Sequence, residues 1–441
     1  MEFLDYCARA REYALSMHDP IIVHHYDADG LASGAIVASA FLNENKKFRR
    51  LCIKKLDDEV IEKLKNDNEK EIIFVDLGSG NERVNELTEN ANIIIIDHHQ
   101  PLKMNVKFHV NCMLFSLDGG MELSAASTAY LVFRNRVDLA VTGAVADQQA
   151  PFQGMNRYIL EEGVAKDEVA IENDLCFYGR YARSLIQFLS LSDDPYIPGI
   201  SYNEDRAVQL LNDLKIELKN GEHWRTYAEL NKEEKTKLVN ALVDILVSRG
   251  SYQKAEELIC ESYVFPKHEK NETYQASEFS TLLNACGRHN AHETGFGVCL
   301  NDKEALEKAK QLLTYHKQKI REGIEFALKN IRDFGKIYFL DARNVIDEGI
   351  IGVVCGIVLP FNAKKPIIGV SLGERDTIKF SGRANKKLIE NGINLGETMK
   401  YACSKAGGVG GGHKIAAGAS TPANKINEFL IFLGEKVRPM S

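Results

Sequence analysis

Residues 93–99 read Ile-Ile-Ile-Ile-Asp-His-His, so an unbroken aliphatic run leads directly into one carboxylate and two imidazoles. A short run of this kind predicts a strand buried on both faces, which is typical of parallel sheets covered by helices. Residues 20–23 and 71–75 form two similar runs, and helix patterns at 31–42 and 124–133 alternate with them. The first third of the chain therefore predicts an α/β domain built around a parallel sheet.

Acidic residues follow these strands at the edge where a parallel sheet binds its ligands. Asp27, Asp76 and Asp97 come after aliphatic strands, and ligands of such sheets bind beyond the carboxyl ends of the strands. Asp29 stands two residues after Asp27, so both carboxylates can address one cavity. Asp147 follows small and apolar residues, where a buried carboxylate is costly unless it is paired or bound to a metal. A turn or a helix cap would explain any one of these acids, but their joint occurrence favours a common site.

The chemistry of this set indicates two metal ions. Carboxylates and imidazoles without thiolates suit Mn²⁺ or Mg²⁺, and the histidines favour Mn²⁺. Five or six such ligands are too many for one ion that must keep open positions, whereas they fit two ions about 3.5–4 Å apart that activate a water for phosphoester hydrolysis. A two-metal peptidase or amidohydrolase is chemically possible from the ligands alone.

The composition bounds the class of protein. The chain has 441 residues, enough for two or three domains, and 44% hydrophobic residues, enough for a sizeable core. We expect no membrane span, because no stretch of about 18 apolar residues occurs, and no secretory signal. The nine cysteines include no C-x-x-C pair, which predicts reduced thiols and a cytoplasmic protein. The net charge of −7 argues against a basic coat but allows a local nucleic-acid channel.

The rest of the chain divides into a helical section and a second set of strands. Residues 150–190 are mixed helix and loop, and the breaker at 192–199 marks a boundary. Asn231 and Glu234 form a capping box before a helix that runs to Arg249. A long amphipathic helix is predicted for 301–334. Strands are then predicted from four further apolar runs, at 337–340, 350–358, 366–371 and 377–380.

Residues 407–414 read Gly-Gly-Val-Gly-Gly-Gly-His-Lys near the C-terminus. Such glycines let backbone N–H groups approach a phosphate, and His413 and Lys414 add donors. The spacing is not that of a P-loop, and a flexible loop or a tight contact between helix and strand is the alternative. Arg383 follows a predicted strand and could grip a phosphate in a fork, although a lone arginine in this position is more often a solvated surface residue.

These motifs resemble the DHH phosphoesterase superfamily. The order His25-x-Asp27-x-Asp29-Gly30, then Asp76, then 97–99, then Asp147 is similar to its catalytic domain. Ser381-Gly382-Arg383 and the glycine-rich end resemble the DHH-associated domain. The two together, with Thr281 to Arg288, resemble the archaeal RecJ-like branch, and the active-site motifs show none of the losses of inactive helicase-component relatives.

The resemblance implies a fold and a domain order. We expect a DHH catalytic domain at 1–190, a helical insert at 191–260, and a long connecting helix with an α/β DHH-associated domain at 261–441. The C-terminal domain would close a cleft over the metal site.

The resemblance also implies a role for each residue. His25 would be a further ligand, with its neighbour His24 as the alternative, and His99 would contact the scissile phosphate or assist the leaving group. Asp97 would hold His98 or its neighbours in place rather than bind metal. The ligands of two Mn²⁺ ions, or of Mg²⁺, would be Asp27, Asp29, Asp76 as the bridge, His98 and Asp147. Substrate phosphates would be held by Arg383, Gly411, Gly412 and His413.

The function implied is a metal-dependent phosphodiesterase that degrades single-stranded DNA or RNA from an end. A phosphodiesterase of short oligoribonucleotides or cyclic dinucleotides would use the same residues. A non-catalytic scaffold of a replication complex, docking through the helical insert, is the third reading. Neither the polarity of cleavage nor the choice between DNA and RNA follows from the sequence, since the latter depends on contacts to the 2′-OH.

Overall fold

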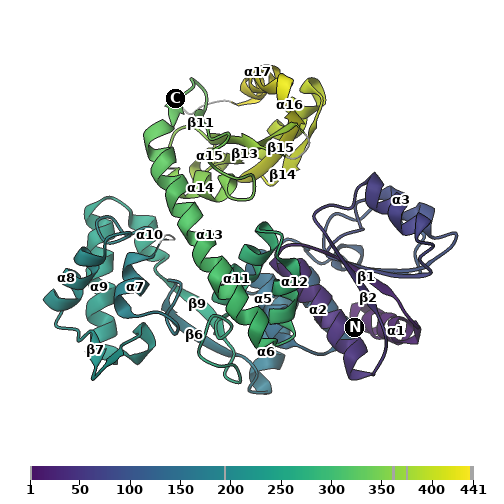
Figure 1. Cartoon of the computed structure of the whole chain (residues 1–441), viewed down its shortest axis with the longest axis horizontal. Helices are drawn as coiled ribbons and strands as arrows, with labels where there is room; N and C mark the ends of the chain where they lie inside the picture. The colour runs from purple at the N-terminus through teal and green to yellow at the C-terminus, as the bar shows by residue number, and fades with distance from the viewer. Residues whose placement is uncertain (1, 193–194, 360–362, 374–375, 438–441) are drawn as a thin grey trace. The chain divides into compact units, whose positions relative to one another are not determined.

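The computed structural model describes residues 2–437 except 193–194, 360–362 and 374–375. The chain forms two compact units, Met1–Leu313 and Thr314–Ser441 (Figure 1). Among the described residues, no helix is long and apolar enough to cross a membrane.

The first unit is built on a five-stranded parallel sheet in the order β2-β1-β3-β4-β5, as predicted. Alternate residues of its strands point to opposite faces of the sheet, and each face packs in a separate hydrophobic core. Ile94 and Ile96 pack with the helices of one face, while Ile93 and Ile95 pack with a helix and a loop on the other. Burial on both faces is what the continuous isoleucine run requires. The strands are β1 (Ile21–His25), β2 (Arg49–Ile53), β3 (Glu71–Val75), β4 (Asn92–Asp97) and β5 (Phe108–Asn111).

Helices on the first face are started by polar caps. Asp27 accepts from the Gly30 N–H at the start of α2 (Ala28–Asn43), and Ser124 caps α4 (Ala125–Phe133). These two pack with α5 (Val137–Ala146), and α11 (Ala276–Arg288) and α12 (His292–Cys299) join them from later in the chain. Other helices of the unit are α1 (Glu2–Ser16), α3 (Asp58–Asn66) and α6 (Gly154–Ala165).

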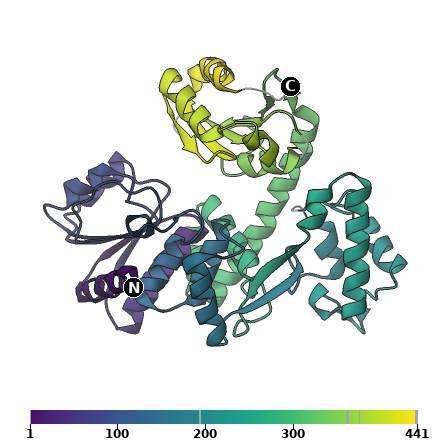
Figure 2. The same cartoon turned by 180° about the vertical axis from the view of Figure 1, so that it is seen from behind.

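The predicted helical insert belongs to a helical region, residues 176–258, which is joined to the rest of the first unit by an antiparallel ribbon of β6 (Ala170–Leu175) and β9 (Ile259–Val264), as both views show (Figures 1 and 2). It has its own hydrophobic core, which draws on residues between Leu175 and Leu258. The capping box of Asn231 and Glu234 is present at the start of α9. The other elements are α7 (Leu185–Ser190), α8 (Glu204–Asp213), β7 (Lys219–Asn220), β8 (His223–Trp224), α9 (Lys232–Ser248) and α10 (Tyr252–Glu256).

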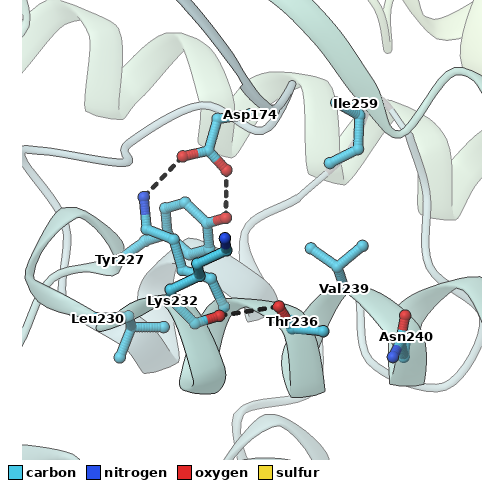
Figure 3. A pocket seen from close by; sticks show the side chains of 9 residues that line it. Asp174, Tyr227, Leu230, Lys232, Thr236, Val239, Asn240 and Ile259 are labelled. Carbon is cyan, nitrogen blue, oxygen red and sulfur yellow. Dashed lines mark hydrogen bonds and ion pairs between the residues drawn. The ribbon is translucent and has the colours of Figure 1, made fainter.

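Hydrogen bonds and a disulfide connect the helical region to the ribbon. Asp174 of β6 accepts from the Tyr227 hydroxyl, beside a hollow lined by α9 (Figure 3), and from Lys235 Nζ at 2.7 Å. Cys176 and Cys260 form a disulfide 84 residues apart in sequence. The prediction of reduced thiols throughout is therefore wrong for this pair, because the ribbon brings together two cysteines that sequence spacing keeps apart.

The predicted boundary at 192–199 includes Asp193 and Asp194, which lie outside the described residues. The long amphipathic helix is α13 (Lys303–Asn330), a little shorter than expected.

The second unit contains a six-stranded mixed sheet in the order β10-β11-β12-β13-β15-β14. Helices α16 (Leu395–Ala406) and α17 (Ile426–Lys436) cover one face, with Phe380 of β13 stacked on Phe429. Predicted strands at 337–340, 366–371 and 377–380 are found. The strands are β10 (Arg332–Asp333), β11 (Tyr338–Asp341), β12 (Ile367–Leu372), β13 (Thr377–Arg383), β14 (Val409–Gly412) and β15 (Ala416–Pro422).

The predicted strand at 350–358 is wrong, because this segment is the helix α14 (Ile351–Val358). Its buried residues include Ile351, Val354 and Cys355, spaced as on one helical face packed against β12 and β13. A short apolar run does not by itself distinguish a buried helix from a buried strand.

Candidate active site

Polar residues at the ends of three neighbouring strands lie at one edge of the sheet. His25 is the last residue of β1, Asp76 follows β3, and Asp97 ends β4. Asp76 has a left-handed backbone (φ 60°) and is almost fully buried. That conformation is uncommon for a residue other than glycine, and it occurs here where the chain turns out of the sheet.

One donor group consists of His25, Asp27 and Asp76. His25 Nδ1 lies 2.9 Å from Asp27 Oδ2 and 3.3 Å from Asp76 Oδ2. Burial disfavours the charged imidazole, but the two carboxylates outweigh it and raise the pKa of His25. Asp76 Oδ2 is itself buried and accepts no hydrogen bond from the described residues. A buried carboxylate oxygen without a donor is costly, and a cation at this position would satisfy it.

A second donor group consists of Asp29, His98 and Asp147. His98 Nε2 lies 3.2 Å from Asp147 Oδ2, 3.5 Å from Asp76 Oδ1 and 4.0 Å from Asp29 Oδ2. The other ring nitrogen, Nδ1, donates to the Gly119 carbonyl at 2.7 Å. This bond leaves Nε2 facing the acids, as in metal-binding histidines whose second nitrogen donates to a carbonyl.

Asp29 is held at the N-terminus of α4. It accepts from Ser124 Oγ at 2.9 Å and from the backbone N–H groups of Ala125 at 2.7 Å and Ala126 at 3.0 Å. Even so, burial and then the negative charge of Asp76 raise its pKa to about 7. Carboxylates crowded in this way repel one another, and divalent cations between them would remove the repulsion.

Asp97 hydrogen-bonds to the ring and backbone of His99, but only to the backbone of His98. Its Oδ1 accepts from His99 Nδ1 at 2.8 Å and from the backbone N–H groups of His98 and His99, while Oδ2 accepts from the Ser79 N–H. Asp97 is fully buried, whereas 59% of the His99 side chain is exposed. A saturated carboxylate behind an exposed imidazole orients that ring.

The structure separates the two adjacent histidines of β1. His24 is fully buried and donates from Nδ1 to the His25 carbonyl, while Arg50 donates to its Nε2 at 3.1 Å. Its ring stacks on Phe296 of α12, and burial lowers its pKa to about 3. His24 therefore faces the helices, and only His25 faces the acids.

Helix α11 contributes residues to the site edge whose roles the sequence did not predict. Asn284 Oδ1 accepts from the Ala28 N–H at 3.1 Å, which fixes the loop that carries Asp27. A side chain at Gly287 would meet the Tyr26 carbonyl at 2.1 Å, so the helix lies directly against that loop. Burial lowers the pKa of Arg288, against the opposing effect of Tyr26 and Asp27. The segment 281–288 carried a family signal but no indication of this contact.

In the second unit, Arg383 and the glycine hairpin occupy one end of the sheet. Arg383 of β13 pairs with Ala416 of β15, and His413 donates its backbone N–H to the Ala416 carbonyl at 2.8 Å. Gly412 pairs with Ala417, and both Gly412 and His413 are exposed. The predicted substrate residues of this unit are thus neighbours.

The glycines of the hairpin have different surroundings. A side chain at Gly410 would meet Cys403 Sγ at 2.8 Å and the Met399 carbonyl at 3.0 Å, so close packing of β14 on α16 requires glycine there. A side chain at Gly411 would meet no heavy atom within 4 Å. The tight contact between helix and strand accounts for Gly410 but not for Gly411.

Comparison with known proteins agrees with this architecture. The DHH family N-terminal domain matches residues 20–149, the DHH-CID domain matches 177–259, and the DHHA1 domain matches 335–438. Over 437 residues the chain is 32% identical to an uncharacterised protein of Methanocaldococcus jannaschii, covering 95% of this chain and 94% of that protein.

Solved structures share the fold. RecJ from Thermus thermophilus in complex with Mn²⁺ superposes with a TM-score of 0.62 at 18% identity, covering 99% of this chain and 54% of that one. The chain thus spans about half the length of that RecJ. A structure of exonuclease RecJ bound to manganese has a TM-score of 0.57 at 19% sequence identity, and the match covers 98% of this chain and 93% of that one. CDC45 from Entamoeba histolytica has a TM-score of 0.64 at 14% identity, and the match covers 99% of this chain and 98% of that one.

A parallel sheet with acids and histidines at its carboxyl edge, followed by a separate mixed sheet, defines a phosphoesterase of the DHH type. The chain belongs to the DHH phosphoesterase superfamily, and its fold is like that of RecJ.

Proposed function

We propose that the protein is a phosphodiesterase that hydrolyses single-stranded nucleic acid from an end with two divalent cations. The observation that carries the proposal is the position of Asp76. Its Oδ2 faces His25 in one donor group, and its Oδ1 faces His98 in the other. A carboxylate shared in this way is the bridge that a two-metal site requires.

Two of the donor groups would provide the two cation sites. His25 and Asp27 would hold one cation, and Asp29, His98 and Asp147 would hold the other, with Asp76 common to both. Oxygen and imidazole ligands suit Mn²⁺, with Mg²⁺ as the alternative. When bound, such a pair lowers the pKa of a water and neutralises charge on the phosphoryl oxygens.

In this proposal His99 acts on the leaving group. Its Nδ1–H is committed to Asp97, and this hydrogen bond, against the effect of burial, raises the pKa of the ring. In the proposed step the oxygen of water forms the new bond to phosphorus, and the bond to the nucleoside oxygen breaks with its electrons on that oxygen. His99 supplies the Nε2 proton that this oxygen takes up and is reprotonated by solvent, to which the water loses its own proton.

Arg383, Gly411, Gly412 and His413 are proposed to hold substrate phosphates. A guanidinium binds phosphate in a fork, and backbone flanked by glycines lets a phosphate approach closely. The division into a DHH domain at 1–190, an insert at 191–260 and a C-terminal region at 261–441 is part of the same proposal.

Scaffolding in a replication complex is a second candidate, favoured by the likeness to CDC45 along nearly the whole of both chains. The insert, with its own core, would then be the docking element. The complete set of donor residues is the reason to prefer catalysis.

The test uses end-labelled single-stranded DNA and RNA of graded length, incubated with the full chain and Mn²⁺. The proposal expects shortening from one end on long strands and none with Asp76→Ala. Cleavage confined to two- to five-mers would replace it with the small-substrate reading. No cleavage of any length by the wild-type chain would favour the scaffold.

A further inference from the structure

A buried polar network lies directly behind the Asp97–His99 pair. The Ser79 backbone N–H donates to Asp97 Oδ2 at 3.0 Å, and Asn111 Nδ2 donates to the His99 carbonyl at 2.8 Å. Thus one member of the network holds the carboxylate and another holds the main chain of the histidine. The pairing of β4 with β5 places Asn111 beside Asp97.

The side chains of the network are also hydrogen-bonded to one another. Asn111 Nδ2 also donates to Ser79 Oγ at 2.9 Å, so the serine hydroxyl is left to donate to His109 Nε2 at 2.8 Å. Burial lowers the pKa of His109, which keeps the ring a neutral acceptor. Each of Ser79, His109 and Asn111 is buried.

Buried polar groups of this number are costly unless each is satisfied, and a satisfied network fixes a single arrangement. An apolar core would support β4 and β5 equally well. What the polar network adds is therefore the orientation of the groups to which it is hydrogen-bonded. It touches Asp97 and the backbone of His99, both on the side away from the exposed ring.

We propose that Ser79, Asn111 and His109 are positioning residues that set the orientation of His99 toward the leaving oxygen of the substrate. The inference rests on the proposed function, because it assigns these residues to the proton transfer by His99. None of the three would touch substrate or cation.

Two variants isolate the network. Ser79→Ala removes the hydroxyl and keeps the backbone N–H that Asp97 accepts. Asn111→Asp keeps an oxygen for the Met113 N–H, which Asn111 caps at 3.0 Å, and removes both donations from Nδ2. Ser201→Ala is the matched control, since Ser201 is also buried and its Oγ is hydrogen-bonded to Ser192 and Ile197 in the insert.

The readout compares leaving groups. On a nucleic-acid strand, whose leaving oxygen needs a proton, we expect kcat to fall about 10- to 100-fold in both variants, part of the usual contribution of general acid catalysis. On a nucleoside p-nitrophenyl phosphodiester, whose leaving group needs no proton, we expect a change of less than about 3-fold. KM and Mn²⁺ binding measured by titration calorimetry should match those of the wild type and of Ser201→Ala.

Equal losses on the two substrates would overturn the inference, because a merely structural defect does not distinguish leaving groups. Unchanged kcat on the strand would overturn it as well. If the wild-type chain hydrolyses neither substrate while it binds Mn²⁺, the proposed function fails first. A folding defect is recognised separately by a fall in Tm, and Ser79→Thr, which restores the hydroxyl, should then recover kcat on the strand if the network positions His99.

Discussion

The strand-end cluster of the first unit and the glycine hairpin of the second are both polar edges of a sheet, but they are built in opposite ways. In the cluster, Asp29, Asp76 and Asp97 are buried and held from several sides. In the hairpin, Gly412 and His413 are exposed, and their backbone is held by the pairing with β15 and by α16, whose Gly396 lies against the Gly412 carbonyl. Buried and hydrogen-bonded carboxylates, as in the cluster, keep a fixed geometry around bound charge. An exposed hairpin, in contrast, leaves its backbone accessible to a ligand.

The comparison predicts that substitutions in the cluster abolish hydrolysis but leave the affinity for nucleic acid nearly unchanged. Asp76→Asn removes the shared negative charge without changing size, and we expect kcat to fall by at least about 10³-fold, because the activated water is lost. Binding of a labelled strand, measured by fluorescence anisotropy, should change by less than about 3-fold, since positively charged contacts to phosphate dominate affinity. Mn²⁺-dependent hydrolysis at the wild-type rate would refute the assignment.

His99→Ala should have the next largest effect. Loss of the proton donor should lower kcat about 10²-fold on a strand, while the Mn²⁺ content should stay at the wild-type value because the proposal does not use His99 as a ligand. Metal analysis by mass spectrometry beside initial rates provides the check. Loss of a cation together with activity would instead make His99 a ligand.

Changes at the second edge should act on binding. Arg383→Ala is expected to raise KM about 10-fold with kcat nearly unchanged, and to make the dependence of affinity on salt shallower by roughly one phosphate contact. Affinities measured across a salt series test both parts. An unchanged affinity and slope would show that Arg383 only packs against α14, where its guanidinium lies beside Gly352.

The smallest effects should separate two adjacent glycines. Gly410→Ala forces β14 away from α16, so Tm should fall by about 4 °C for a loss of roughly 1 kcal/mol in a unit of this size. Gly411→Ala meets open space and should leave Tm unchanged while raising KM a few-fold. Equal behaviour of the two variants in both assays would remove the distinction between a packing glycine and a ligand-facing one.

Much of the first edge could be predicted because its signal is local. An aliphatic run that ends in Asp97 and two histidines specifies both a buried strand and the edge at which its polar residues emerge. The choice between His24 and His25 could not be made, because it depends on Arg50 and Phe296, which reach His24 from other elements.

Other features depended on tertiary contacts that sequence does not show. Ser79, His109 and Asn111 are unremarkable in sequence and become a network only when β3, β4 and β5 pair. The Cys176–Cys260 bond similarly depends on the ribbon that joins the ends of the insert. For α14 the physics was ambiguous, since an apolar run of nine residues fits either a helix or a strand.

The central claim is that two cations share Asp76, and a titration of Mn²⁺ into the chelator-treated chain tests it most directly. Electron paramagnetic resonance would follow the bound ions while hydrolysis of a labelled strand is measured in parallel. The account predicts two Mn²⁺ per chain with the signal of a magnetically coupled pair, and activity that appears as the second ion binds. One ion per chain, or two uncoupled ions, with full activity would contradict it.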